Sequence, residues 1–72
     1  MKLSEFPKDC TLSSCRDVIE TLFSGRTVSV YDVDLEQYVI QNIQLDECFE
    51  VAGRMKLLEI DITTDNIVFA VR

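Results

Sequence analysis

The sequence predicts an α+β fold, in which one N-terminal helix is followed by a four-stranded antiparallel meander. The first observation is that apolar residues recur with the helical period of about 3.6 up to residue 24 and alternate with a period of about 2 from residue 27 onward. The second is that the predicted strands are joined by connections of two to four residues. Connections this short suit hairpins and leave no room for parallel crossovers.

Length and composition indicate a single domain over residues 1–72. The chain has 72 residues, near the lower size at which one core can hold a fold. It is 47% hydrophobic and contains only two Gly and one Pro, unlike a disordered chain. We expect an irregular arm over residues 1–12, broken by Pro7, then a helix over 14–24 and an antiparallel sheet over 27–72.

Five apolar residues at helical spacing predict the helix and place one stripe against the sheet. These residues are Cys15, Val18, Ile19, Leu22 and Phe23. Ser14 and Asp17 resemble a capping box with Asp in place of the usual Glu. Gly25 stands where a left-handed residue commonly ends a helix.

Segments rich in β-branched residues predict the four strands. The segments are 27–33, 38–45, 55–62 and 67–71, and Cys48, Phe49 and Val51 are expected to continue the second past a bulge at Asp46-Glu47. The second strand is expected to place Val39, Ile43 and Leu45 on one face and Tyr38 and Ile40 on the other. Apolar residues on both faces of several strands predict a strongly curved, barrel-like sheet, or a second face that meets another subunit.

A helix ahead of a curved antiparallel sheet, with Val28-Ser-Val-Tyr31 opening the first strand, resembles the Sm-like RNA-binding fold. The resemblance covers roughly a third of the chain. The basic and polar residues with which that family contacts RNA have no counterpart here. The resemblance therefore implies an architecture and no function.

The residue types that most enzymes and metal sites need are missing from this sequence. It contains no His, and its two glycines, Gly25 and Gly53, cannot form a phosphate-binding loop. Cys10, Cys15 and Cys48 lack the second paired knuckle of a structural zinc site. We therefore predict no enzymatic activity, no cofactor and no metal site.

The three cysteines and the N-terminal residues bear on localisation. An odd number of cysteines, in a sequence whose start has no apolar signal region, predicts free thiols in a reducing cytoplasm. No apolar run approaches the roughly 20 residues of a membrane-spanning helix.

The negative charge is concentrated in the predicted sheet. The net charge is −6, and from Thr27 onward nine acidic residues face only Arg54, Lys56 and Arg72. Between Thr27 and Gly53 there is no basic residue. A field of this sign repels nucleic-acid phosphates and anionic membranes, so neither is an expected direct partner.

Eight carboxylates in three groups are the predicted partner-binding residues. The groups are Asp32, Asp34 and Glu36; Asp46, Glu47 and Glu50; and Glu59 and Asp61. In a meander these groups can lie on adjacent strands and form one negative face, although a merely solvated strand face stays an alternative.

We therefore predict a small acidic adaptor or inhibitor that docks on a basic protein. One form of this hypothesis is a protein that imitates nucleic-acid charge and blocks a nucleic-acid-binding protein, as small phage-encoded modulators do. Two alternatives remain: a homo-oligomer subunit assembled through the edge of the last strand, and a cation or small-molecule sensor that uses Asp32, Asp34 and Glu36.

Overall fold

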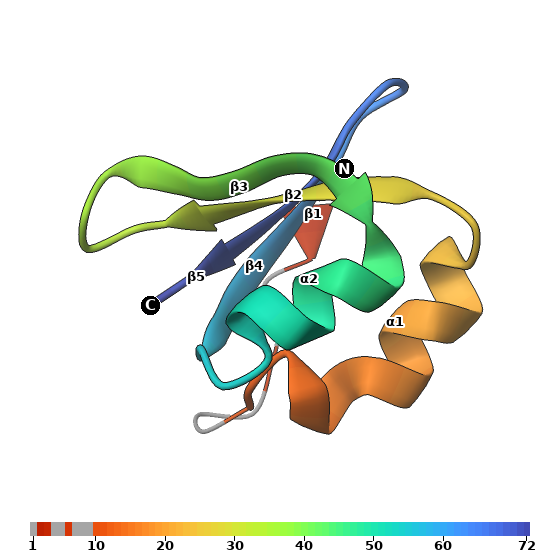
Figure 1. Ribbon diagram of the computed structural model, residues 1–72, viewed down its shortest axis with the longest axis horizontal. Helices are drawn as coiled ribbons and strands as arrows, with labels where there is room; N and C mark the ends of the chain where they lie inside the picture. Colours follow the sequence, from red (N-terminus) through yellow and green to blue (C-terminus); the bar gives the residue numbers. More distant parts are fainter. Residues whose placement is uncertain (1, 4–5, 7–9) are drawn as a thin grey trace.

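Five strands and two α-helices make up the part of the chain that the structure describes (Figure 1). The computed structural model describes residues 2–3, 6 and 10–72. The elements are β1 Lys2–Leu3, the 3₁₀ turn η1 Ser13–Cys15, α1 Arg16–Phe23, β2 Thr27–Asp32, β3 Gln37–Gln44, α2 Leu45–Ala52, β4 Leu57–Ile62 and β5 Ile67–Val71. The strands form one sheet in the order β1-β4-β5-β2-β3, and Figure 1 shows both helices on the same face of it. The predicted α+β class is therefore confirmed.

The predicted N-terminal helix is present, but its start is built differently. The N–H of Thr11 donates to Ser14 Oγ at 2.9 Å, and the N–H of Ser14 donates to Thr11 Oγ1 at 3.1 Å. This reciprocal pair closes η1, and α1 follows with Cys15 as an N-cap whose side chain makes no capping bond. The predicted capping box of Ser14 and Asp17 is therefore wrong. Gly25 does adopt the predicted left-handed conformation, with φ of 79°.

Only part of the predicted apolar stripe of α1 faces the core. Ile19 and Phe23 are buried, whereas Val18 and Leu22 are 63% and 56% exposed. A second helix packs beside α1 and fills much of the same sheet face, so α1 buries only one edge of its stripe.

That second helix, α2, replaces the predicted bulged continuation of the second strand. Leu45, Cys48, Phe49 and Ala52 are all buried, whereas Val51 is 49% exposed. Burial at i, i+3, i+4 and i+7 is helical, so the expected strand residues Cys48, Phe49 and Val51 do not share one face.

Gly53 ends α2 where only a glycine fits. A Cβ at this position would meet the carbonyl oxygen of Phe49 and the hydroxyl of Ser13. The N–H of Ser13 donates to the Gly53 carbonyl at 3.0 Å, which ties η1 to the end of α2. The predicted turn at Ala52-Gly53 is thus also a contact between two distant segments.

The sheet is not the predicted antiparallel meander. β2 and β5 are parallel neighbours, in register from Ser29↔Val68 to Asp32↔Val71. This arrangement is possible because α2 carries the chain from β3 at one edge to β4 near the other edge. The sheet stays open and is not strongly curled, so the barrel-like expectation, which the Sm-like resemblance shared, is wrong.

The two edges of the sheet are β3 and the short strand β1. β1 lies within the predicted irregular arm and pairs with β4 through Lys2↔Asp61 and Leu3↔Ile60. Residues 1, 4–5 and 7–9 of that arm, among them Pro7, lie outside the described residues. β5 lies between β4 and β2, so the last strand is not the free edge that the oligomer hypothesis required.

Register shifts between β2 and β3 decide which face each side chain of β3 takes. The pairs change from Val28↔Ile43 to Val30↔Ile40 and then to Tyr31↔Tyr38, and Asn42 has a φ of 55°. Ile40 and Ile43 therefore pack together against the core, which corrects their predicted placement on opposite faces. The buried sheet residues of this core are Val28, Val30, Leu57, Ile60, Ile67, Phe69 and Val71.

Two of the three cysteines are bonded to each other. A disulfide joins Cys10 and Cys15, whose Cα atoms are brought to 6.8 Å by η1, and Cys48 is free and buried. The prediction of three free thiols is therefore wrong for this pair. Among the described residues, neither α1 nor α2 is long and apolar enough to cross a membrane.

Candidate binding face

One face of the sheet is left uncovered by the helices, and we call it the open face. Its side chains alternate along the strands with those of the core. They are Ser29 and Tyr31 on β2, Tyr38 on β3, Glu59 and Asp61 on β4, and Val68 and Ala70 on β5.

Strand register arranges these side chains in two transverse rows. Glu59 pairs with Ala70, Ala70 with Tyr31 and Tyr31 with Tyr38, so one row crosses β4, β5, β2 and β3. A second row runs from Asp61 through Val68 to Ser29. Each row is acidic at β4 and has no charged residue on β5, β2 or β3, and on the other side of β4 Asp61 pairs with Lys2 of β1.

The two tyrosines form the most prominent feature of the open face. Their ring centroids are 5.1 Å apart with an interplanar angle of 75°, an edge-to-face arrangement. Tyr38 is 45% exposed, and Val33, which follows β2, is 41% exposed beside the same surface. A partly exposed aromatic pair therefore lies on one face of a sheet whose other face is buried.

Two adjoining hollows lie on the open face. The first, with a volume of about 340 Å³, has Val68 and Ala70 between the tyrosines and the carboxylates of Glu59 and Asp61. The second, of about 310 Å³, shares Tyr38 and Val68 with it and is otherwise lined by Ser29, Gln41, Asn42 and Asn66. The first hollow thus joins aromatic and acidic groups, and the second offers amide and hydroxyl groups.

The first predicted acidic group is divided by the turn between β2 and β3. Asp32 is only 8% exposed, and its Oδ1 accepts hydrogen bonds from the N–H groups of Asp34 at 2.9 Å and Leu35 at 3.1 Å. Asp34 Oδ2 lies 3.9 Å from Arg72 Nε at the surface, and Glu36 has a left-handed φ of 54°. These carboxylates do not share an extended face, and Asp32 organises the turn. No group of three or more described Cys, Asp or Glu side chains is placed to hold a metal ion.

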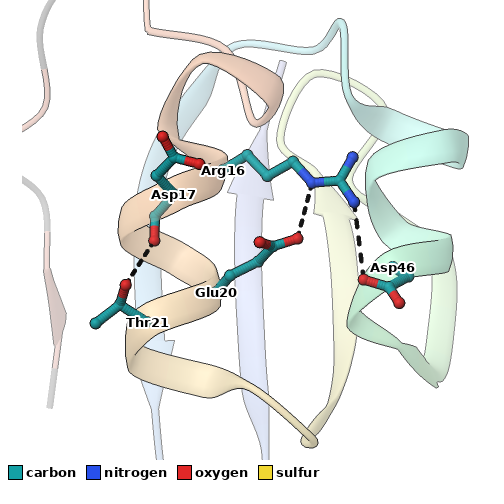
Figure 2. Close-up of polar contacts among 5 residues, drawn as sticks. All are labelled: Arg16, Asp17, Glu20, Thr21 and Asp46. Atoms are coloured by element: carbon teal, nitrogen blue, oxygen red, sulfur yellow. Dashed lines mark hydrogen bonds and ion pairs between the residues drawn. The ribbon is translucent and has the colours of Figure 1, made fainter.

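The second predicted group lies on α2, on the opposite side of the sheet from the open face. Figure 2 shows Arg16 reaching from α1 between Glu20 and Asp46, with Nε 2.8 Å from Glu20 Oε1 and Nη2 3.8 Å from Asp46 Oδ1. Its guanidinium also lies 4.8 Å from the ring centroid of Phe49. The hydrogen bond to Glu20, with the negative charge of Glu20 and of Asp46, raises the pKa of Arg16 above its ordinary value. Asp46 therefore takes part in a link between the helices, while Glu47 and Glu50 are exposed on α2.

The third predicted group is the one that the fold brings to the open face. Glu59 and Asp61 stand two residues apart on β4, with the core residue Ile60 between them. The tyrosines beside them were not predicted as site residues. A signal was present in the sequence, because Tyr31 and Tyr38 bracket the polar turn segment at the positions where a hairpin pairs its strands.

The free cysteine is not a nucleophile at neutral pH. Burial raises the pKa of Cys48 from 9.0 to about 11, with the nearby charge of Asp46 adding to the shift and that of Arg16 opposing it. Its thiol therefore stays protonated, and packing is the role that its position supports.

Comparisons with models of protein families, with curated proteins and with solved structures found no match to this chain.

Proposed function

We propose that this chain is a non-enzymatic binding protein, a small acidic adaptor or inhibitor that docks its open face on a basic surface of a partner protein. One observation carries the proposal: the exposed ring of Tyr38 and the partly exposed side chains of Tyr31, Val68 and Ala70 lie in the same transverse rows as Glu59 and Asp61. Tyrosine is enriched at protein interfaces because it offers a large apolar area with little entropy to lose. The acidic ends of the rows add electrostatic steering toward a basic partner.

The sign of the charge favours a protein partner over a nucleic acid. Exposed tyrosines on a sheet can also stack on bases, but that mode of binding uses a positively charged groove for the backbone. Here the open face carries carboxylates, and the whole chain has a net charge of −6. A nucleic-acid-binding protein, whose own surface is basic, is a partner of fitting chemistry.

The test is a selection of peptides from a random displayed library on the immobilised protein. Under the proposal, selected peptides are enriched in Arg and Lys beside apolar residues, and their affinity falls between about 0.05 M and about 0.5 M ionic strength. Selected peptides without basic enrichment, or with affinities that do not respond to salt, would contradict the proposal.

Two double variants separate the open face from the general negative charge. Glu59→Gln with Asp61→Asn removes two charges from the open face, and Glu47→Gln with Glu50→Gln removes two from α2. We expect the first to weaken peptide binding about tenfold and the second less than about twofold, because close charge pairs dominate over distant ones at physiological salt. Equal losses in both variants would show that net charge, and not this face, attracts the peptides.

The compartment is a separate proposal. We propose the cytoplasm, where Cys10 and Cys15, which are joined by a disulfide in this structure, would be kept as two thiols. Alkylation of thiols in intact cells before lysis measures this: labelling of both cysteines supports a reducing compartment, and protection of both places the protein in an oxidising one.

A further inference from the structure

We infer that the larger hollow of the open face is a pocket for one arginine side chain of the partner. This inference rests on the proposed function and names the group that the site recognises. It is drawn from the shape of the row Glu59, Ala70, Tyr31 and Tyr38 and from the charge at its end.

The smallest side chain of that row makes the hollow. Ala70 lies between Glu59 on one neighbouring strand and Tyr31 on the other. Adjacent strands are about 4.8 Å apart, so the backbones of Glu59 and Tyr31 are separated by about 10 Å, with only a methyl group between them. An elongated side chain from a partner can therefore lie over Ala70 with a different wall on each side.

The two walls suit the two parts of an arginine side chain. Tyr31 and Tyr38 offer ring surface to the methylene stem and to the cationic plane. Glu59 and Asp61 line the same edge of the hollow from backbone positions about 7 Å apart on β4, and Asp61 pairs across the sheet with Lys2 of β1. A guanidinium presents five N–H donors in a flat fork, so it can stack on a ring and donate to a carboxylate at once.

The same geometry predicts discrimination between side chains. A lysine ammonium is a compact, strongly hydrated charge that cannot stack as a plane, so it gains less from the tyrosine wall. Citrulline keeps the planar shape and length of arginine but lacks its charge, so it gains little from the carboxylate wall. The expected order of affinity is arginine, then lysine, then citrulline.

The test uses three short peptides that differ only at a central arginine, lysine or citrulline flanked by glycines. Binding is followed by NMR titration of the isotope-labelled protein. We expect the arginine peptide to shift signals of Tyr31, Tyr38, Val68 and Ala70, and to bind at least about fivefold more tightly than the citrulline peptide, which is near 1 kcal/mol. Equal affinities for arginine and citrulline, or shifts centred on α2, would overturn the inference.

Filling the hollow is the sharpest variant. Ala70→Leu places a larger apolar side chain on its floor, so a pocket for arginine would be blocked, whereas a surface that merely attracts apolar groups would bind more strongly. Tyr38→Ala removes part of the ring wall, and Tyr38→Phe is its control because it keeps the ring. We expect about fivefold or greater losses for Ala70→Leu and Tyr38→Ala, and no more than about twofold for Tyr38→Phe. Amide spectra of each variant check that the sheet is intact.

The outcomes separate this inference from the proposed function. If library peptides bind the open face in a salt-dependent way but Ala70→Leu leaves their binding unchanged, the arginine pocket is wrong and the docking face stands. If basic peptides do not bind the open face at all, both are wrong.

Discussion

The two faces of the central sheet differ in what covers them, although the same strands supply both. On the covered face, Phe69 and Val30 are fully buried beneath α1 and α2. On the open face, the residues that alternate with them include Tyr31 and Ala70, which are partly exposed. One residue step along β2 or β5 thus separates the dry core from the surface.

This difference indicates which residues are tied to stability and which are available for another role. The covered face brings apolar residues from all four long strands and both helices into one cluster. Within the described residues, no helix lies over the open face, and this face carries an aromatic pair next to carboxylates. The apolar side chains of the open face lie outside the core, and they are the ones that the proposed binding role would use.

The largest expected effect comes from truncating one aromatic residue on each face. Phe69→Ala removes a fully buried ring that packs 6.2 Å, centroid to centroid, from Phe23, and we expect it to cost about 3–5 kcal/mol. Tyr38→Ala removes a ring that is 45% exposed, and we expect it to cost about 1 kcal/mol or less. Urea denaturation followed by circular dichroism measures both free energies of unfolding.

The milder variant Phe69→Leu keeps this comparison measurable if Phe69→Ala does not fold. Its expected cost lies between those of Phe69→Ala and Tyr38→Ala. A Tyr38→Ala variant as destabilised as Phe69→Ala would mean that the tyrosine pair is part of the structural core and would remove the distinction between the faces.

The sequence predicted the elements whose pattern has one interpretation. β5 was predicted with its observed bounds, because Ile67–Val71 is β-branched and apolar and is bounded by turn residues. The α1 pattern was equally clear. α2 was missed because Cys48, Phe49 and Val51 can be fitted to a bulged strand, although Leu45, Cys48, Phe49 and Ala52 follow the helical spacing.

That one error accounts for much of the wrong topology. Without α2 the connection from β3 to β4 is too short to cross the sheet, so a meander was the only arrangement left and the parallel pairing of β2 with β5 could not be predicted.

Part of the candidate open face could be identified from the sequence, for reasons of charge and strand register. Glu59 and Asp61 were identified from charge and strand pattern, which a sequence displays directly. The tyrosines were not placed beside them, because their row reaches Glu59 only through the parallel pairing of Tyr31 with Ala70. The predicted meander did not contain that pairing.

The pH dependence of stability reports, through Cys48, whether water reaches the covered face. The expected effect on the free energy of unfolding is of intermediate size. Because burial raises the pKa of this thiol from 9.0 to about 11, the unfolded chain ionises first as the pH rises. The contribution of the neutral Cys48 thiol to the free energy of unfolding is complete below about pH 9 and is lost as the pH rises through about 11. By about pH 10 the loss is about 1 kcal/mol.

Cys48→Ala is the control, since it removes the titrating group while other groups keep titrating. The stability difference between the parent protein and this variant is expected to narrow between about pH 8.5 and about pH 10. A difference that stays constant over this range would mean that the thiol beneath the sheet is reached by water.

The smallest expected effect concerns the contact between α1 and α2, the two helices on the covered face. Arg16 links them by charge and is half exposed. Arg16→Gln removes the ion pairs with Glu20 and Asp46 and the stacking on Phe49. We expect it to lower the urea denaturation midpoint by less than Phe69→Ala does and by less than ionisation of Cys48 does. Exposed ion pairs are screened, so part of this decrease should disappear at high salt, while the part due to packing on Phe49 remains.

Arg54→Gln is the matched control, because it removes the same charge from an exposed position after α2 and should shift the midpoint less. Peptide binding at the open face should be the same in both variants. If Arg16→Gln weakened that binding while Arg54→Gln did not, the two faces would be coupled through the sheet, and the separation of stability from binding that their side chains indicate would be wrong.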